Sequence, residues 1–201
     1  GVSAYVVALA VSGDDVFVGG AFVSAGGIAA NCIARWNGST WQALGSGGGN
    51  GVNSQVNALA VSGGDLFVGG LFNQANVGAA IPANRIARWN GSAWQALGSG
   101  GGNGVNSSVS ALVVSGGELY VGGSFTQANV GASIPANGIA RWSNGTWQAL
   151  GSSGGNGVNG SVSALAASGG DLFVGGSFSE ANVGVGIPAN RIARWNGSAW
   201  Q

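Results

Sequence analysis

The stretch VNALAVSGGDLFVGGLFNQANVGAAIPANRIARWNGSAWQAL, residues 56–97, decides the fold because the chain contains it four times in closely similar form. Aligning the copies divides the 201 residues into repeats 1–50, 51–103, 104–156 and 157–201. The first copy is shorter, with its deletion between Phe22 and Arg35. A period of about 50 residues is typical of stacked supersecondary units that together form one domain. We therefore treat 1–201 as a single domain made of four repeated units.

Each copy predicts four short strands. In the second copy these are the apolar segments 56–61, 66–68, 86–89 and 94–97. The pair Asn90-Gly91 between the last two predicts a two-residue hairpin turn, because Asn and Gly tolerate the positive φ that such a turn needs. No segment shows a sustained helical period of 3.6, and glycine interrupts the chain too often for helices. The chain is therefore expected to be all-β.

The strand segments are almost continuously apolar, which predicts sheets that are covered on both faces. A four-stranded unit of about 50 residues cannot cover its own faces, so neighbouring units must do so. This combination predicts a β-propeller with four tandem blades. The repeated tryptophans are expected to pack between the blades. They are Trp36, Trp41, Trp89, Trp94, Trp142, Trp147, Trp195 and Trp200.

Three motifs of the repeat are similar to a known family. The series Val-Gly-Gly-x-Phe at 68–72, Ile-Ala-Arg-Trp-Asn-Gly at 86–91 and Trp-Gln-Ala-Leu at 94–97 resembles kelch-type and related bacterial propeller repeats. The resemblance implies that the diglycine ends the second strand and that a tryptophan packs between blades. It also implies a binding scaffold or an extracellular module. The Arg-Trp-Asn-Gly hairpin departs from the usual kelch spacing, and the histidine copper ligands of the family's oxidases have no counterpart in a chain without histidine.

The composition argues against several classes of function. Six Arg balance six acidic residues, and the chain has no Lys, so no basic surface for nucleic acid is expected. No apolar stretch approaches the roughly 18 residues of a membrane-spanning helix, so membrane insertion is not expected. The chain shows no signal peptide and has no initiating Met, which leaves a natural, excised or designed origin open.

Catalysis is not expected either. There is no histidine base, no clustered pair of acids and no group of metal ligands, so neither a catalytic site nor a cofactor is predicted. Cys32 is the only cysteine, which rules out an internal disulfide, and its counterparts Arg85, Gly138 and Arg191 show that the repeat does not require a thiol.

One acidic and one basic position recur in every copy. A repeated salt bridge that orders each blade is the favoured interpretation, and a ring of carboxylates around a cation is the alternative. The acids are Asp15, Asp65, Glu118 and Asp171, and the bases are Arg35, Arg88, Arg141 and Arg194.

The loops between the second and third strands are candidate ligand sites, since loops on a rigid scaffold often bind. Their polar residues are Asn73, Gln74, Asn76, Gln127, Asn129, Glu180 and Asn182. Glycosylation sequons begin at Asn37, Asn90, Asn106, Asn144, Asn159 and Asn196, but Asn-Gly in the hairpins is explained by the turn itself.

The exposed faces that four blades would leave at their ends predict self-assembly. We expect a homodimer that closes an eight-bladed ring, with a self-closed four-bladed ring or a piece of a longer propeller as alternatives. The first functional hypothesis is a non-enzymatic, symmetric scaffold. The second is a lectin-like or protein-binding module of an exported bacterial surface protein, which uses the repeated loops to bind a glycan or a protein. An extracellular or cell-surface location fits both.

Overall fold

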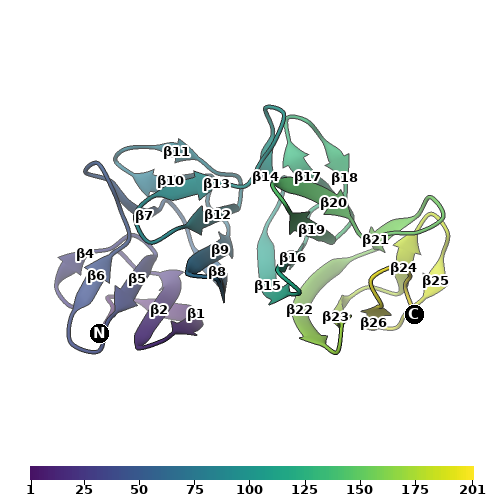
Figure 1. Cartoon of the computed structure of the whole chain (residues 1–201), viewed down its shortest axis with the longest axis horizontal. Helices are drawn as coiled ribbons and strands as arrows, with labels where there is room; N and C mark the ends of the chain where they lie inside the picture. The colour runs from purple at the N-terminus through teal and green to yellow at the C-terminus, as the bar shows by residue number, and fades with distance from the viewer. The chain divides into compact units, whose positions relative to one another are not determined.

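The computed structural model describes all residues 1–201 and contains strands but no helices, which confirms the predicted all-β class (Figure 1). No helix is present that could cross a membrane. The chain divides into two compact units, Gly1–Ala96 and Leu97–Gln201, and each holds two of the repeats. The division falls before Leu97 and not at a repeat boundary. In unit 2 the Leu97 carbonyl accepts a hydrogen bond of 2.9 Å from the indole of Trp147, which ties the linker to the blade that follows it.

Unit 1 contains blades 1 and 2, each an antiparallel four-stranded sheet in the order of the chain. Blade 1 consists of β1 (Tyr5–Ser12), β2 (Asp15–Ala21), β5 (Ile33–Trp36) and β6 (Trp41–Ala43). Blade 2 consists of β8 (Val56–Ser62), β9 (Asp65–Gly70), β12 (Ile86–Trp89) and β13 (Trp94–Ala96). A β-bulge interrupts the first strand pair of each blade, as between Val56 and Ala58.

Unit 2 repeats this design in blades 3 and 4. Blade 3 consists of β15 (Val109–Ser115), β16 (Glu118–Gly123), β19 (Ile139–Ser143) and β20 (Thr146–Ala149). Blade 4 consists of β22 (Ser161–Ser168), β23 (Asp171–Ser177) and β26 (Ile192–Trp195). A single bridge between Trp195 and Trp200 takes the place of its fourth strand.

Small additional sheets form from segments that the sequence analysis treats as linkers and loops. A short strand of the glycine-rich linker pairs with the long loop that follows the second strand of the blade. These three-stranded sheets are β7 (Asn50–Val52), β10 (Gln74–Val77) and β11 (Ile81–Pro82); β14 (Asn103–Val105), β17 (Gln127–Val130) and β18 (Ile134–Pro135); and β21 (Asn156–Val158), β24 (Glu180–Val183) and β25 (Ile187–Pro188). Blade 1 has the shorter pair β3 (Ser24–Ala25) and β4 (Ile28–Ala29).

The hairpin turn differs from the prediction in three of the four blades. In blade 2 only Gly91 has positive φ, at 93°, while the Asn90 side chain accepts hydrogen bonds from the next two backbone N–H groups beyond Gly91. The sign pattern is that of a type II′ turn, whose first central residue is glycine. Blades 1 and 4 have the same arrangement. Blade 3 alone has positive φ at both central residues, 49° at Asn144 and 78° at Gly145, as a type I′ turn requires.

Each blade has two chemically distinct faces. The tryptophan face carries both tryptophans, with ring centroids 5.4 Å apart for Trp89 and Trp94. The isoleucine face carries, in blade 1, Phe17, Ile33 and Leu44. In unit 1 the tryptophan face of blade 2 and the isoleucine face of blade 1 share one buried core, and the Trp94 indole donates a hydrogen bond of 2.9 Å to the carbonyl of Leu44.

Unit 2 has the same joint between blades 3 and 4. The isoleucine face of blade 3 contributes Tyr120, Ile139 and Leu150 to a core with the tryptophan face of blade 4. Trp200 donates a hydrogen bond of 3.1 Å to the Leu150 carbonyl. A buried tryptophan stabilises by about 2–3 kcal/mol or more through its apolar area, so these joints are the main cohesive contacts of each unit.

Candidate functional site

The repeated acid and arginine form one ion pair within each blade. Strand pairing sets Arg35 opposite Phe17, two residues from Asp15, and this register recurs in every blade. The shortest N–O distances are 2.7 Å for Arg35–Asp15, 2.9 Å for Arg88–Asp65, 3.0 Å for Arg141–Glu118 and 3.0 Å for Arg194–Asp171. Because the side chains are partly exposed, each pair contributes at most about 1 kcal/mol. Each carboxylate is thus engaged by the arginine of its own blade.

Blade 3 adds a phenol to its ion pair. The Tyr120 hydroxyl donates a hydrogen bond of 3.0 Å to Glu118 Oε2, which also accepts from Arg141. Burial opposes ionisation of Glu118, but the Tyr120 hydrogen bond and the Arg141 charge outweigh it, so the pKa of this carboxyl lies below its ordinary value. Burial and the bond to Glu118 raise the pKa of Tyr120.

Three of the predicted ligand residues are buried and hold the backbone. Asn76, Asn129 and Asn182 are at most 3% exposed and have φ between 53° and 55°. The Asn129 amide accepts a hydrogen bond of 3.1 Å from Ser99 N and donates one of 2.9 Å to Ser99 O. The other two bind Ser46 and Ser152 in the same way. These amides therefore fasten the linker turn to its blade, contrary to the exposed binding role that the sequence suggests.

The remaining predicted ligand residues lie at the starts of the small sheets. Asn53 Oδ1 accepts hydrogen bonds from the backbone of Asn73 and Gln74, and its amide donates one of 2.7 Å to Asn73 Oδ1. Gln127 and Glu180 occupy the position of Gln74 in the other blades and are half-buried. The loops thus keep these polar side chains on their own blades: blade 2 has Asn73 and Gln74, blade 3 has Gln127 and blade 4 has Glu180.

The outer faces of the first and last blades are exposed. Val6 on β1 is 46% exposed, whereas its equivalents Val56 and Val162 are 0% exposed. Ile192 on β26 is 65% exposed, whereas its equivalent Ile139 is fully buried. The sequence predicts that the first and last blades have exposed faces, but it does not show which residues lie on those faces.

The first glycine of the diglycine forms a seat for the valine of the next blade. A Cβ on Gly19 would lie 2.5 Å from Val56 Cγ1, and a Cβ on Gly122 would lie 2.5 Å from Val162 Cγ1. Glycine is needed because any side chain there would displace the valine. At Gly175 of blade 4 the nearest such atom lies 3.8 Å away and belongs to the same blade. We call this position the empty valine seat.

Both exposed faces are hollowed and apolar. On the tryptophan face of blade 1, Val16, Val18, Trp36 and Trp41 surround a hollow of about 260 Å³. On the isoleucine face of blade 4, a hollow of about 200 Å³ surrounds the empty valine seat. Its lining comprises Ala164, Leu165, Ala166, Phe173, Val174, Gly175 and Ile192.

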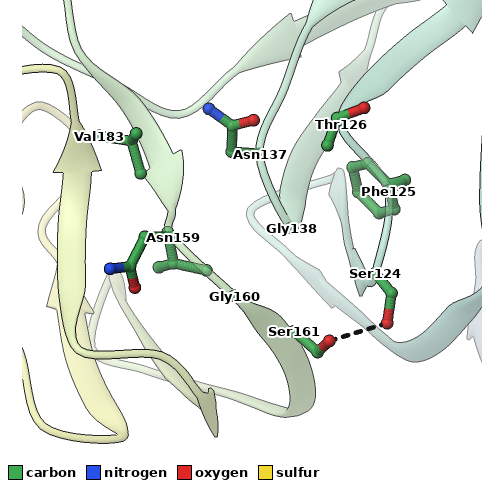
Figure 2. Close-up of a pocket in the computed structure, with 10 residues that line it drawn as sticks. Ser124, Phe125, Thr126, Asn137, Gly138, Asn159, Gly160, Ser161 and Val183 are labelled. Atoms are coloured by element: carbon green, nitrogen blue, oxygen red, sulfur yellow. Dashed lines mark hydrogen bonds between the residues drawn. The ribbon is translucent and has the colours of Figure 1, made fainter.

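A third hollow, of about 360 Å³, lies between blades 3 and 4 (Figure 2). Blade 3 supplies Ser124, Phe125 and Gly138 to its wall, and blade 4 supplies Ser161 and Val183. A hydrogen bond of 2.9 Å between the two serine hydroxyls closes one end, as the dashed line in Figure 2 shows. No charged residue belongs to the lining. Chemically, the hollow offers hydroxyl and peptide groups beside apolar side chains.

The chain matches no known family model, and no curated protein resembles it in sequence. Solved structures do resemble it. The computationally designed protein Ika4 is 18% identical, with a TM-score of 0.56 over 97% of this chain and 92% of Ika4. The WD40 β-propeller domain of Doa1 is 13% identical, with a TM-score of 0.56 over the full chain and 54% of the Doa1 chain. This chain therefore spans about half of the Doa1 structure. Together with the four repeated sheets, this likeness confirms that the chain has the β-propeller fold.

Proposed function

We propose that the protein is a non-enzymatic, self-assembling scaffold, in which a second copy covers the two exposed blade faces. The observation that carries this proposal is that the two exposed faces are complementary: blade 1 exposes Val6, and blade 4 exposes the empty valine seat at Gly175. The tryptophan face of one copy docks on the isoleucine face of the other. Two such joints close a homodimer with eight blades.

The two joints inside the chain support this pairing. Blades 1 and 2 join through Gly19 and Val56, and blades 3 and 4 join through Gly122 and Val162, with the same 2.5 Å geometry. The exposed faces carry the same repeat positions, so the surfaces that complement each other within a unit are also available between copies. A head-to-tail contact closes a ring when its rotation permits and otherwise forms an open filament.

The particle mass in solution tests the proposal. Light scattering coupled to size exclusion should give twice the 19.4 kDa of the chain. Gly175→Val places a branched side chain in the empty seat, where the blade has room for it, and should yield a folded monomer. Val185→Ser is the matched control, because Val185 is an exposed valine on a loop away from both hollows. It should leave the mass unchanged.

A wild-type protein that stays monomeric at micromolar concentration would overturn self-assembly. A dimer that persists in Gly175→Val would overturn the valine-seat joint. A series of higher multiples would keep the joint but contradict the closed ring, because it indicates a rotation that does not close.

A further inference from the structure

The hollow between blades 3 and 4 coincides with a break in the repeat. The position occupied by Cys32, Arg85 and Arg191 in the other blades is glycine in blade 3, Gly138. The backbone is the same in all four, with φ of 61°, 65° and 69° at the three side-chain-bearing residues and 68° at Gly138. Gly138 and Arg85 each donate a backbone hydrogen bond of 2.8 Å to the equivalent phenylalanine carbonyl. Blade 3 therefore keeps the backbone conformation and hydrogen bond of this position and lacks only the side chain.

Blade 2 shows what the missing side chain would contact. The Arg85 guanidinium folds back on its own blade, where Nη1 donates hydrogen bonds of 3.0 Å to Leu71 O and 3.1 Å to Phe72 O. The equivalent residues in blade 3 are Ser124 and Phe125, and both line the hollow. The hollow thus extends over the part of the blade that Arg85 covers in blade 2.

The lining fits a planar cation on an apolar stem. A guanidinium is weakly hydrated and donates through a fixed fork, so it can use carbonyl and hydroxyl oxygens without a partner carboxylate, as Arg85 does. Val183 provides apolar contact for the stem, and Ser124 and Ser161 add hydroxyl oxygens. Figure 2 shows the Asn159 amide turned away from the hollow, toward its hydrogen bonds with blade 4.

The strand that contributes Val183 also departs from the repeat in charge. Glu180 on β24 stands where the other small sheets have Gln74 and Gln127. Its N–H donates a hydrogen bond of 3.0 Å to Asn159 Oδ1, and Asn159 belongs to the lining. The Glu180 carboxylate itself lies beside Gly186, where Oε1 would be 3.8 Å from an added Cβ, and Arg191 of the same blade lines a second hollow together with Asn159. Opposite charges therefore flank Asn159, and the preference of the hollow rests on its uncharged oxygens.

We propose that this hollow binds a guanidinium group, such as the side chain of an arginine in a peptide, in the place that Arg85 fills in blade 2. The site lies within unit 2 and does not depend on self-assembly. It would give the scaffold a binding position at the joint between blades 3 and 4, where blade 3 has no side chain at position 138.

A titration of the full chain followed by NMR tests this site. N-acetyl-L-arginine amide should shift the backbone amide signals of Gly138 and Gly160, with a dissociation constant on the order of 1 mM, as expected for so small a group. N-acetyl-L-lysine amide, a point charge, and N-acetyl-L-citrulline amide, a neutral isostere, should each bind at least about tenfold more weakly.

Two variants locate the binding. Gly138→Arg restores the residue of blade 2 and should abolish the shifts by filling the hollow. Because any Cβ at position 138 would lie 2.7 Å from Gly160 O, Ser124→Leu is made in parallel, since Ser124 is an exposed residue of the lining and leucine is its equivalent in blade 2, Leu71. It should weaken binding at least about fivefold, by partial filling of the hollow.

Two outcomes with the wild-type protein alone would overturn the proposal, whatever the variants do. One is an absence of shifts at Gly138 and Gly160 with the arginine probe at tens of millimolar. The other is an equal response to the arginine and lysine probes, which would show nonspecific cation binding.

Discussion

Replacing Asn129 by alanine and by glycine should destabilise unit 2 by different amounts. The difference measures the cost of the backbone conformation, and the loss common to both measures the contribution of the side-chain hydrogen bonds. Asn129 is 3% exposed, bonds both backbone groups of Ser99 and has φ of 53°. Alanine removes both hydrogen bonds and must still adopt positive φ. Glycine removes the same bonds but adopts that φ without strain.

The magnitudes follow from these two contributions. Each lost hydrogen bond costs about 1 kcal/mol net, because Ser99 is half-buried and water can partly replace the amide. Left-handed backbone costs a residue with a Cβ roughly 1–2 kcal/mol. Asn129→Ala should therefore lower the free energy of unfolding by about 3–4 kcal/mol and Asn129→Gly by about 2 kcal/mol.

Urea unfolding, followed by the fluorescence of the eight tryptophans, measures the effect. All variants are compared at one protein concentration, since association would add to the apparent stability. Ser163→Ala, at an exposed position on β22, serves as the control and should stay within about 0.5 kcal/mol of wild type. Equal losses for Ala and Gly would refute the backbone argument. Losses below about 0.5 kcal/mol for both would show that the Ser99 bonds do not hold the linker.

Three further predictions, made with four substitutions, test the blade joints and the hydrogen bonds of Trp147 and Tyr120. Ile139→Ala should lower the free energy of unfolding by about 2–5 kcal/mol, because Ile139 is fully buried. Ile192→Ala should lower that of the monomer by less than about 0.5 kcal/mol, because Ile192 is 65% exposed. Urea unfolding of dilute protein compares the two variants. Trp147→Phe should cost about 1 kcal/mol beyond its lost area, because its indole hydrogen bond disappears; thermal unfolding reads this loss. The raised pKa of Tyr120 favours its neutral form in the fold, so its contribution is complete below the ordinary pKa of about 10 and is lost as pH rises through the folded value. Tyr120→Phe should flatten the fall of the unfolding midpoint at alkaline pH, and an unchanged slope would contradict this assignment.

The sequence predicts the strands of the blades well because their signals are local. The third strand of the second copy, expected at 86–89, is β12 with the same bounds, and the second strand, expected at 66–68, is β9 with one or two residues added at each end. Glycines and apolar runs mark the ends of these strands. Because the same pattern occurs in all four copies, a chance pattern in one copy does not mislead the prediction. The acid and arginine positions recur for the same reason.

The small sheets and the three II′ turns could not be predicted because their causes are not local. The strand Asn50–Val52 pairs with a loop more than twenty residues away, and nothing in a glycine-rich linker signals that partner. Asn76 reads as a polar loop residue, yet its positive φ and its bonds to Ser46 turn it inward. The polarity of Asn76 therefore did not predict whether its side chain is exposed.

The hollow at Gly138 corresponds to a sequence difference that an alignment of the four copies shows. A glycine replaces an arginine at one of four equivalent positions, while the neighbouring positions keep their residue types. The alignment shows that blade 3 has no side chain where the other copies have one. Only the structure shows that the guanidinium of Arg85 covers loop carbonyls, and hence what kind of group could replace it.

The exposed faces of blades 1 and 4 carry the same apolar positions that join blades inside each unit. Repeat arrays that remain monomeric usually carry polar outer faces on their terminal units, because exposed interior faces promote association. The exposed faces here are apolar, with Leu9 and Val11 on blade 1 and Ile192 on blade 4 at 64–65% exposure. On blade 1, Val7 even stands where the other bulges carry Asn57, Ser110 and Ser163. Blade 4 keeps a glycine at position 175 with no valine to seat, although a Cβ would fit there. Both features match the joints inside each unit, so these faces are complementary to another blade of the same repeat.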